Sequence, residues 1–315
     1  MKILFTGASS FTGCWFVKQL LDHGHDVVAV YQRSRDSYKG LRDQRIRLIE
    51  DRATCIYECS YGSDVFLELV KSEKRWDLLA HHAADVTDYH SDEFDIARAV
   101  GRNTLNTMTI MKLLRERECD RVLLTGSVFE QNEGAGSEGG CAFSPYGLSK
   151  GITSEMFHYY GDMLGMVIGK FVIPNPFGPL EEPRFTNYLM KTWSSGDVPG
   201  VRTPDYVRDN IHVSLLAGIY AKFTKDLPYA QGHRKINPSG YVETQGAFAL
   251  RFAKEMRSRL NHDCKVDLCT QTEFAEPRVR INLDPVSGQV AEWDESAAWD
   301  AIAAYYADVY PNLGS

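Results

Sequence analysis

The chain has 315 residues, and 43% of them are hydrophobic, which is enough for a large α/β domain with a sizeable core. Acidic residues outnumber basic ones, and the net charge of -7 argues against nucleic acid or an anionic membrane as the main partner. No apolar run approaches the roughly 20 residues that cross a bilayer. The seven cysteines are scattered without a CxxC pair, so we expect no disulfide framework, no metal site and a reducing, cytoplasmic location.

Short apolar runs alternate with helical patterns through the first half of the chain. The strand-like runs lie at 3–5, 27–30, 78–80, 122–124 and 167–173. The first two enclose a helical pattern, and a strand, a helix and a strand within about 30 residues form a βαβ unit with a right-handed crossover. Further helices are predicted near 92–116 and 147–163. Residues 1–175 therefore predict a doubly wound parallel α/β sheet of the Rossmann type, which binds dinucleotides.

The second part of the chain has a different character. Proline and glycine become denser after residues 173–179, and the alternation of strands and helices fades. We expect residues 176–315 to form a smaller α/β lobe that binds substrate, with some segments returning to the first domain. An amphipathic last helix is predicted at about 294–309. Residues 131–140 are polar and rich in glycine, which is typical of a mobile loop.

A glycine-rich turn, TGASSFTG, follows the first strand. Gly7 permits the tight turn, and Gly13 lets the next helix pack closely while its N-terminal amides face an anion. Ser10 stands where a further glycine is usual, and its small side chain can fit there or its hydroxyl can donate to a phosphate. The alternative is an ordinary strand–helix turn. The cofactor contacts predicted from this turn are Gly7, Ser9, Ser10, Phe11, Thr12 and Gly13.

The end of the second strand, VAVYQRSR, bears on the choice of dinucleotide. NAD-binding folds present an acidic residue to the adenosine ribose here, but Tyr31 occupies that place, and Arg33 and Arg35 follow. Two guanidinium groups suit a 2′-phosphate. We therefore predict NADP as the cofactor, with NAD as the alternative. A solvated basic loop would explain the same residues without a cofactor.

Tyr146 and Lys150 lie four residues apart in SPYGLSK, so at the start of a helix they share one face. An ammonium group beside a phenol favours the phenolate and lowers the tyrosine pKa from about 10, which makes the tyrosine a useful acid or base. Ser127 follows the strand at 122–124, at the carboxyl edge of the sheet, where open α/β folds bind ligands. These three residues are the catalytic candidates, and a surface helix pair is the structural alternative for Tyr146 and Lys150.

Together these residues resemble the extended short-chain dehydrogenase/reductase family, whose members include nucleotide-sugar epimerases, dehydratases and reductases. The resemblance also rests on HHAA (81–84), Asn103, PNPFGP (174–179) and VRDNIHV (207–213). It implies that Tyr146 is the general acid/base and that Lys150 holds the nicotinamide ribose and lowers the tyrosine pKa. It also implies that Ser127 polarises the reacting carbonyl or hydroxyl.

The resemblance implies binding roles as well. The further cofactor contacts are Ala83, Ala84, Asn103 and Lys150. The nucleotide-diphosphate sugar would contact Asn175, Asn187, Arg208 and Arg278. For Arg278 a solvated edge strand is nearly as good an explanation. The helices around Asn103 and after Tyr146 resemble the pair that forms the dimer interface in this family, so we expect a homodimer.

Departures from the family pattern narrow the reaction. The 4,6-dehydratases place an Asp-Glu pair directly after the serine or threonine, whereas Val128 and Phe129 follow here, and Glu130 and Glu133 are out of register. This argues against a 4,6-dehydratase. Because Tyr31, Arg33 and Arg35 favour NADP, we expect an enzyme that uses NADPH to reduce a 4-keto nucleotide-diphosphate hexose. The alternative is a nucleotide-sugar C4-epimerase that works through a transient 4-keto sugar on a retained cofactor, usually NAD. A third interpretation is a non-catalytic dinucleotide sensor. Such a protein would lack the catalytic tyrosine or lysine, whereas Tyr146 and Lys150 are both present here. The nucleotide base and the sugar stay open.

Overall fold

The computed structural model describes residues 1–136, 140–229, 232–286 and 288–313. They divide into two compact units. Unit 1 is drawn from residues 1–133, 140–173 and 217–237, and unit 2 from residues 134–139, 174–216 and 238–315. In the part of the chain that the structure describes, every helix is too short or too polar to cross a membrane.

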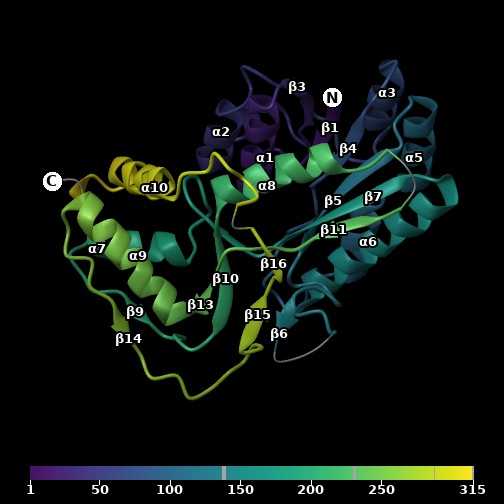
Figure 1. Ribbon diagram of the computed structural model, residues 1–315. Coiled ribbons are helices and arrows are strands. Elements are labelled where there is room, and N and C mark those ends of the chain that lie inside the picture. Colours follow the sequence, from purple (N-terminus) through teal and green to yellow (C-terminus); the bar gives the residue numbers. More distant parts are fainter. Residues whose placement is uncertain (137–139, 230–231, 287, 314–315) are drawn as a thin grey trace. The chain divides into compact units, whose positions relative to one another are not determined.

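A seven-stranded parallel sheet forms the centre of unit 1 (Figure 1). In spatial order the strands are β11 (Arg234–Ile236), β7 (Val167–Ile173), β5 (Arg121–Ser127), β4 (Leu78–His81), β1 (Lys2–Thr6), β2 (Asp26–Val30) and β3 (Thr54–Ile56). From β1 the chain builds outward through β2 and β3, and then continues on the other side of β1 with β4. This order confirms the doubly wound parallel sheet that the apolar runs predict.

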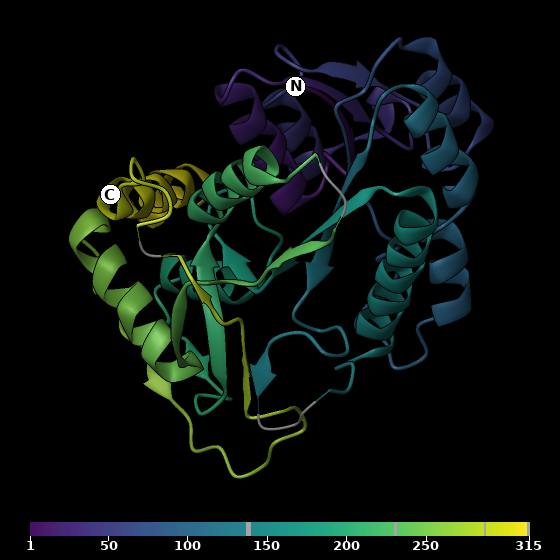
Figure 2. The ribbon, with the colours of Figure 1, turned by 45° about the vertical axis from the view of Figure 1, so that its right-hand side comes forward.

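Helices cover both faces of this sheet (Figure 2). They are α1 (Phe11–Asp22), α2 (Gly40–Arg47), α3 (Asp64–Ser72), α4 (Ile96–Asn103), α5 (Thr107–Glu116), α6 (Pro145–Leu164) and α8 (Val213–Asp226). On one face the ring of Phe16 in α1 stacks on Tyr220 in α8, with centroids 4.0 Å apart. On the other face α3, α5 and α6 bury a core that includes Phe66, Ile110 and Phe157. Parallel strands covered on both faces are hydrophobic almost throughout, which is why their sequences show apolar runs.

The single helix predicted near 92–116 is wrong, because the chain forms two helices there. α4 ends at Asn103, and α5 begins at Thr107. Between them Asn106 takes a left-handed conformation with φ +55°, and its side-chain amide donates to the carbonyl of Gly62 at 2.8 Å. Asparagine tolerates this conformation better than most residues, so it ends the helical periodicity locally.

Unit 2 is built on a smaller mixed sheet. Its strands are β13 (Tyr241–Thr244), β10 (Val207–His212), β15 (Val279–Ile281), β6 (Ala135–Gly136) and, paired with β10, β8 (Asn175–Phe177). Two strand pairs stand apart, β12 (Pro238–Ser239) with β16 (Asp284–Pro285) and β9 (Gly200–Val201) with β14 (Asp267–Leu268). Because residues 135–136 form β6, the loop predicted at 131–140 contains a strand, and residues 137–139 of that loop lie outside the described residues.

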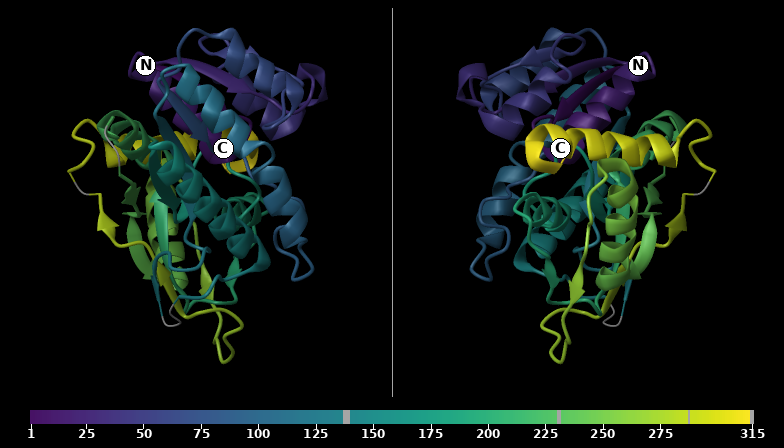
Figure 3. Two further views of the ribbon diagram at one scale, coloured as in Figure 1. Left: turned by 90° about the vertical axis from the view of Figure 1, so that its right-hand side faces the viewer. Right: turned by 90° about the vertical axis from the view of Figure 1, so that its left-hand side faces the viewer.

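Three helices complete unit 2, namely α7 (Phe185–Ser194), α9 (Gln245–Leu260) and α10 (Glu295–Val309). They share a buried core that includes Trp193, Phe252 and Trp299, and α10 packs across one end of α9 (Figure 3). The last helix agrees with the one predicted at about 294–309. The α/β composition of this unit confirms the smaller α/β region expected from the sequence.

Candidate active site

The glycine-rich turn connects β1 to α1 in unit 1 and is packed against the end of β4. Gly7 has φ +83°, and a Cβ there would lie 2.8 Å from the backbone nitrogen of Ala83. A Cβ on Gly13 would collide with the carbonyl oxygen of Gly7. Within the described residues nothing accepts a hydrogen bond from the backbone N–H groups of Phe11 and Thr12. Two amides at a helix N-terminus beside a tight glycine turn fit a pyrophosphate.

Ser10 and His82 close this turn from inside the protein. The Ser10 hydroxyl caps α1 by accepting from Gly13 N at 3.1 Å, and it donates to the carbonyl of Gly7 at 2.9 Å. His82 Nε2 lies 2.9 Å from the same hydroxyl, so the histidine is the donor there. Its Nδ1 lies 2.9 Å from the Thr125 hydroxyl at the end of β5. Burial lowers the pKa of His82 to about 3. Ser10 thus holds the cradle in shape through a neutral histidine.

The residues after β2 offer less to a 2′-phosphate than the sequence suggests. The Tyr31 ring is buried and stacks on Tyr57 with centroids 4.9 Å apart. Arg35 forms ion pairs with Asp43 at 2.7 Å and with Glu50 at 2.8 Å, and hydrogen bonds to these carboxylates raise its pKa. Arg33 is exposed and forms no ion pair with the described residues. Of the two arginines it is therefore the one whose charge is directed to solvent.

The three catalytic candidates belong to two neighbouring elements of unit 1. Ser127 is the last residue of β5. α6 begins at Pro145, and Ser144 caps it, because the Ser144 side chain accepts a hydrogen bond from Gly147 N at 3.1 Å. The segment after β5 packs against the start of α6, because Phe143 N donates to the carbonyl of Phe129 at 2.8 Å and their rings stack. Pro at the first helical position and Ser at the cap are a typical helix start. This start fixes where the Tyr-x-x-x-Lys turn lies.

Lys150 is buried, and its ammonium group donates to the carbonyl of Thr125 in β5. Burial lowers its pKa, while the carboxylate of Glu130 raises it and Lys170 lowers it further. Tyr146 is half-buried one turn earlier on α6, with its ring 5.5 Å from that of Tyr89. A phenol and an ammonium on one face of α6, next to the strand that ends in Ser127, can exchange and orient a proton.

The remaining cofactor candidates of unit 1 lie around the end of β4. Ala83 N donates to the Thr6 hydroxyl at 3.0 Å, and Ala84 follows it, half-buried. Asn103 is buried, and its side chain accepts from Asp85 N at 2.8 Å and donates to the Thr153 hydroxyl at 3.5 Å. The Asn103 amide therefore ties the loop after β4 to α6. Ser9 is buried in the glycine turn, where its carbonyl accepts from Arg45 at 3.5 Å.

The substrate candidates all belong to unit 2. They do not form one cluster there, and Arg208 lies beside Arg280, which was not predicted to bind substrate. Arg208 is buried on β10 and pairs with Glu276 at 2.8 Å. Its register partner on β15 is Arg280, which is also buried, whereas Arg278 is exposed with its guanidinium 3.9 Å from the Phe274 ring centroid. Two candidates lie elsewhere in the unit. They are Asn175, which starts β8 beside Asn210 of β10, and Asn187 of α7, which accepts from the Tyr310 hydroxyl at 3.4 Å.

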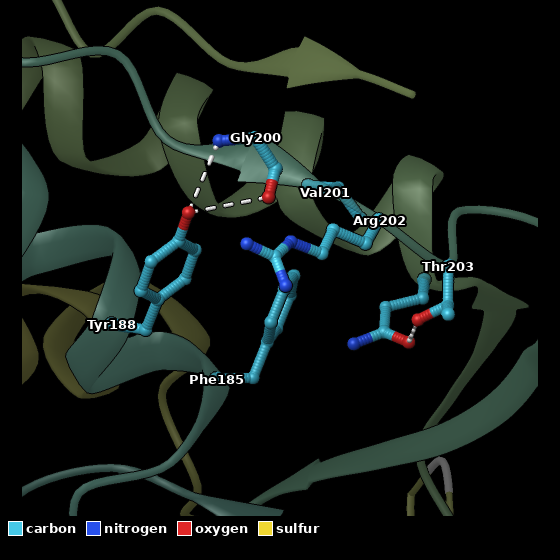
Figure 4. Close-up of a pocket in the computed structure, with 7 residues that line it drawn as sticks. Phe185, Tyr188, Gly200, Val201, Arg202 and Thr203 are labelled. Carbon is cyan, nitrogen blue, oxygen red and sulfur yellow. Dashed lines mark hydrogen bonds between the residues drawn. The ribbon is translucent and has the colours of Figure 1, made fainter. Parts of the chain in front are cut away.

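A pocket of about 290 Å³ opens in unit 2 between α7 and β9 (Figure 4). It is lined by Phe185, Tyr188, Gly200, Val201, Arg202, Thr203 and Gln245. The Tyr188 hydroxyl donates to the carbonyl of Gly200 at 3.2 Å, which fixes one wall. Figure 4 shows the Arg202 side chain extended toward Tyr188 and Phe185. Aromatic rings, a guanidinium plane and a glutamine amide suit a flat heterocycle.

Sequence reasoning assigned no supporting role to several residues that the structure brings to these sites. His82 and Arg45 support the glycine turn, and Arg280 accompanies Arg208. Glu130 and Lys170 form a buried pair beside Ser127. For Glu130 the sequence holds a signal, because Glu130 directly follows the apolar residues Val128 and Phe129. A carboxylate buried with such residues is expected to have a charged partner. Which lysine would pair with it cannot be deduced from sequence spacing.

Residues 3–226 match the model of a family described as the NAD dependent epimerase/dehydratase family. A Methanocaldococcus jannaschii protein provisionally named as a UDP-glucose 4-epimerase is 23% identical over 232 residues, which are 68% of this chain and 72% of that protein. The residues matched by the family model contain the glycine turn and all three catalytic candidates.

Two solved structures have the same fold. A Thermotoga maritima UDP-glucose 4-epimerase with UDP-glucose has a TM-score of 0.74 at 18% identity, covering 98% of this chain and 99% of that one. A Bacillus cereus UDP-glucuronic acid 4-epimerase in complex with UDP-glucuronic acid and NAD has a TM-score of 0.74 at 19% identity, covering 98% and 100%.

Proposed function

Because the chain belongs to the NAD dependent epimerase/dehydratase family, we propose that it is a UDP-sugar 4-epimerase that retains NAD. The family confirms the class of enzyme and the resemblance that the sequence motifs predict. Relatives and structural neighbours named as 4-epimerases support the epimerase alternative over the keto-sugar reduction predicted first. The neighbour that holds NAD likewise supports NAD over NADP.

The observation that carries the choice of cofactor is the environment of Arg35. A 2′-phosphate needs cationic groups that are not already neutralised, and this guanidinium is held between Asp43 and Glu50. The buried ring of Tyr31 adds no cation, which leaves the exposed Arg33 as the one predicted contact that could meet a 2′-phosphate. The ribose of NAD, which has a hydroxyl at this position, places no such demand on the two residues.

The residues of unit 1 fit a bound dinucleotide and the proton chemistry of epimerisation. The Phe11 and Thr12 amides would hold the pyrophosphate, and Lys150 would hold the nicotinamide ribose. The bound cofactor supplies reversible hydride acceptance at the sugar C4. Tyr146 would take the proton from the C4 hydroxyl and return it after the sugar has turned, with the positive charge of Lys150 favouring the phenolate. The Ser127 hydroxyl would hydrogen-bond to the same oxygen.

The residues of unit 2 fit the nucleotide part of the substrate. The pocket lined by Phe185, Tyr188 and Arg202 would take the uracil ring. Arg208 and Arg280 are register partners and both are buried, with Glu276 2.8 Å from Arg208 and 3.8 Å from Arg280, so these two guanidinium groups would meet the diphosphate. Arg280 replaces Arg278 in this proposal, since Arg278 is exposed and its guanidinium lies over the half-buried ring of Phe274.

The decisive experiment follows the sugar and the cofactor together. Purified protein is incubated with UDP-glucose, UDP-N-acetylglucosamine or UDP-glucuronic acid, and the C4 epimer is measured by NMR. We expect one of these sugars to be interconverted without added cofactor, since NAD is retained. Turnover of a 4-keto sugar with stoichiometric loss of NADPH, and no epimer formation, would instead establish the reductase.

A Tyr146→Phe substitution tests the assignment of the acid/base. Removing a general acid/base typically lowers the rate by about 10²–10⁴-fold, and we expect a loss of kcat in that range. Tyr159→Phe is the matched control, because Tyr159 lies on the same helix and is 64% exposed. If the two variants turn over equally, Tyr146 does not carry the proton.

A further inference from the structure

A buried ion pair lies beside the proposed catalytic serine and has no part in the chemistry assigned so far. Glu130 is 1% exposed and Lys170 is 6% exposed, with their charged atoms 2.7 Å apart. Lys170 also contacts Glu133 at 2.7 Å, and Glu133 is bound by Lys235 at 3.1 Å and by Asn237 at 2.9 Å. A buried pair gains little net stability, because desolvation of both charges opposes their attraction.

The second oxygen of Glu130 reaches the end of β5. Glu130 Oε1 accepts from the backbone N–H of Ser127 at 2.7 Å, and Glu130 N donates back to the carbonyl of Ser127 at 3.0 Å. The turn is thus closed twice by one residue, once through its backbone and once through its carboxylate. The Ser127 hydroxyl accepts from Phe129 N at 3.2 Å within the same turn.

Gly126 makes room for this arrangement. A Cβ at Gly126 would lie 2.8 Å from Cε of Lys170 and 3.2 Å from Oε1 of Glu130. The glycine before the serine therefore lets a lysine of β7 cross under β5 and reach the carboxylate. Gly126, Glu130 and Lys170 are therefore packed against one another, although 40 positions in the sequence separate Glu130 from Lys170.

The charges of this pair also act on Lys150. Glu130 raises its pKa and Lys170 lowers it, and burial lowers it most. The two histidines at the end of β4, on which the charge of Lys150 acts, are neutral because burial lowers each pKa to about 3. Glu130 is therefore the carboxylate that favours the charged form of Lys150.

We propose that Glu130 is a positioning residue, which holds the Ser127 backbone through one oxygen while Lys170 anchors the other, so that the serine hydroxyl keeps its place at the end of β5. This inference rests on the proposed function in one respect, namely the assignment of Ser127 to the reacting sugar oxygen. The hydrogen bond itself belongs to the protein alone and can be measured without substrate.

Two double variants separate the hydrogen bond from the charges. Glu130→Gln/Lys170→Met removes both charges and keeps an oxygen that accepts from Ser127 N. Glu130→Met/Lys170→Met removes both charges and that oxygen. Neither leaves a single uncompensated charge of the pair in the interior. Lys235→Met serves as the control, because Lys235 is half-exposed and contacts the network only at Glu133.

The readouts are hydrogen exchange at the Ser127 amide and the separate values of kcat and KM. We expect the Met/Met variant to exchange the Ser127 amide at least tenfold faster than the Gln/Met variant. Its kcat should be lower by on the order of ten- to hundredfold with KM unchanged, since small misplacement of a catalytic group has costs of that size. Lys235→Met should match the wild type.

Equal exchange in the two double variants would overturn the inference, and so would faster exchange with equal kcat. If the Met/Met variant does not fold, Glu130→Ala/Lys170→Met replaces it, and equal exchange at Ser127 in that variant and in the Gln/Met variant would contradict the role. A protein that epimerises no nucleotide sugar would refute the proposed function. The exchange comparison would still decide whether Glu130 holds the serine.

Discussion

Ser10 is the residue of the glycine turn whose role was open, and its hydroxyl has partners on three sides. It caps α1, it donates to Gly7, and it accepts from His82. All three contacts are with the protein, so the hydroxyl is engaged in shaping the turn. The pyrophosphate can be held by the amides of the next two residues, which have no acceptor in the described part of the chain.

We therefore predict that Ser10→Gly lowers stability more than it lowers cofactor affinity. Loss of a weak cap and of one hydrogen bond to a buried group should reduce the free energy of unfolding by about 1 kcal/mol. Urea unfolding measures this change, and calorimetric titration with NAD measures the affinity. A tenfold weaker affinity, about 1.4 kcal/mol, would show that the hydroxyl contacts the cofactor.

Ser63→Gly is the matched control for this variant. Ser63 caps α3 by accepting from Phe66 N at 3.3 Å, as Ser10 caps α1, and it has no histidine partner. The difference between the two losses of stability therefore measures the contact between Ser10 and His82. Equal losses would mean that this contact contributes nothing.

At the scale of elements, the end of β4 joins the glycine turn to α4 and β5 through two histidines. His81 contacts the Thr6 hydroxyl at 3.1 Å and the carbonyl of Asn103 at 3.2 Å. His82 links Ser10 to Thr125. Burial lowers the pKa of each histidine to about 3, so both are neutral in the folded protein near neutral pH.

These histidines make the fold sensitive to acid. Below an unfolded-state pKa of about 6.5, the unfolded chain binds one more proton per histidine than the folded protein does. Their contribution to stability is complete above this pH and is lost as the pH falls toward 3. We expect each histidine to lower the free energy of unfolding by about 1.4 kcal/mol per pH unit in that range.

Urea unfolding at pH 7.5, 6.0 and 5.0 tests this prediction with His82→Gln. Glutamine can donate and accept as the histidine does but takes up no proton, so the slope of stability against pH should fall by about 1.4 kcal/mol per unit. His23→Gln is the control, because His23 is exposed at the end of α1. An unchanged slope for His82→Gln would show that His82 is not the group that takes up the proton.

The elements that could be predicted are those whose burial or helical face is visible in the pattern of neighbouring residues. All residues of β5 and β7 except the last of each strand are buried, so apolar runs predict these strands. The spacing of Tyr146 and Lys150 likewise predicts that both lie on one face of α6. β3 is a partly exposed edge strand of three residues and shows no such run. The break between α4 and α5 depends on Asn106 reaching Gly62, which lies 44 positions away, and no local pattern contains that contact.

At the scale of the whole molecule, unit 1 is completed by a late segment of the chain. Residues 217–237 supply most of α8 and the edge strand β11, and Tyr220 stacks on Phe16 from the first helix. The buried guanidinium of Arg121 donates to the carbonyl of Leu227 at 3.1 Å and lies 3.7 Å from the Tyr229 ring centroid. Periodicity reveals such elements but not which sheet they join, so this pairing could not be deduced from sequence.

A fragment of residues 1–175 should therefore fail to fold by itself. It would expose the apolar face around Phe16 and Phe171 and would leave Arg121 without its carbonyl and aromatic partners. We expect circular dichroism to show no cooperative thermal transition for this fragment, whereas the full chain should show one. Cooperative melting of the fragment together with NAD binding would contradict this expectation.

During synthesis of the chain, Lys170 has an effect that differs from its role in the folded protein. β7 reads VIGKFVI, and until Arg234–Ile236 leave the ribosome its outer edge has no strand to pair with. At roughly 5–20 residues per second this exposure lasts several seconds. An apolar strand with an open edge invites pairing with other chains, and a lysine in its middle discourages that pairing. The lysine in the middle of β7 would thus oppose aggregation of the nascent chain until β11 has covered that edge.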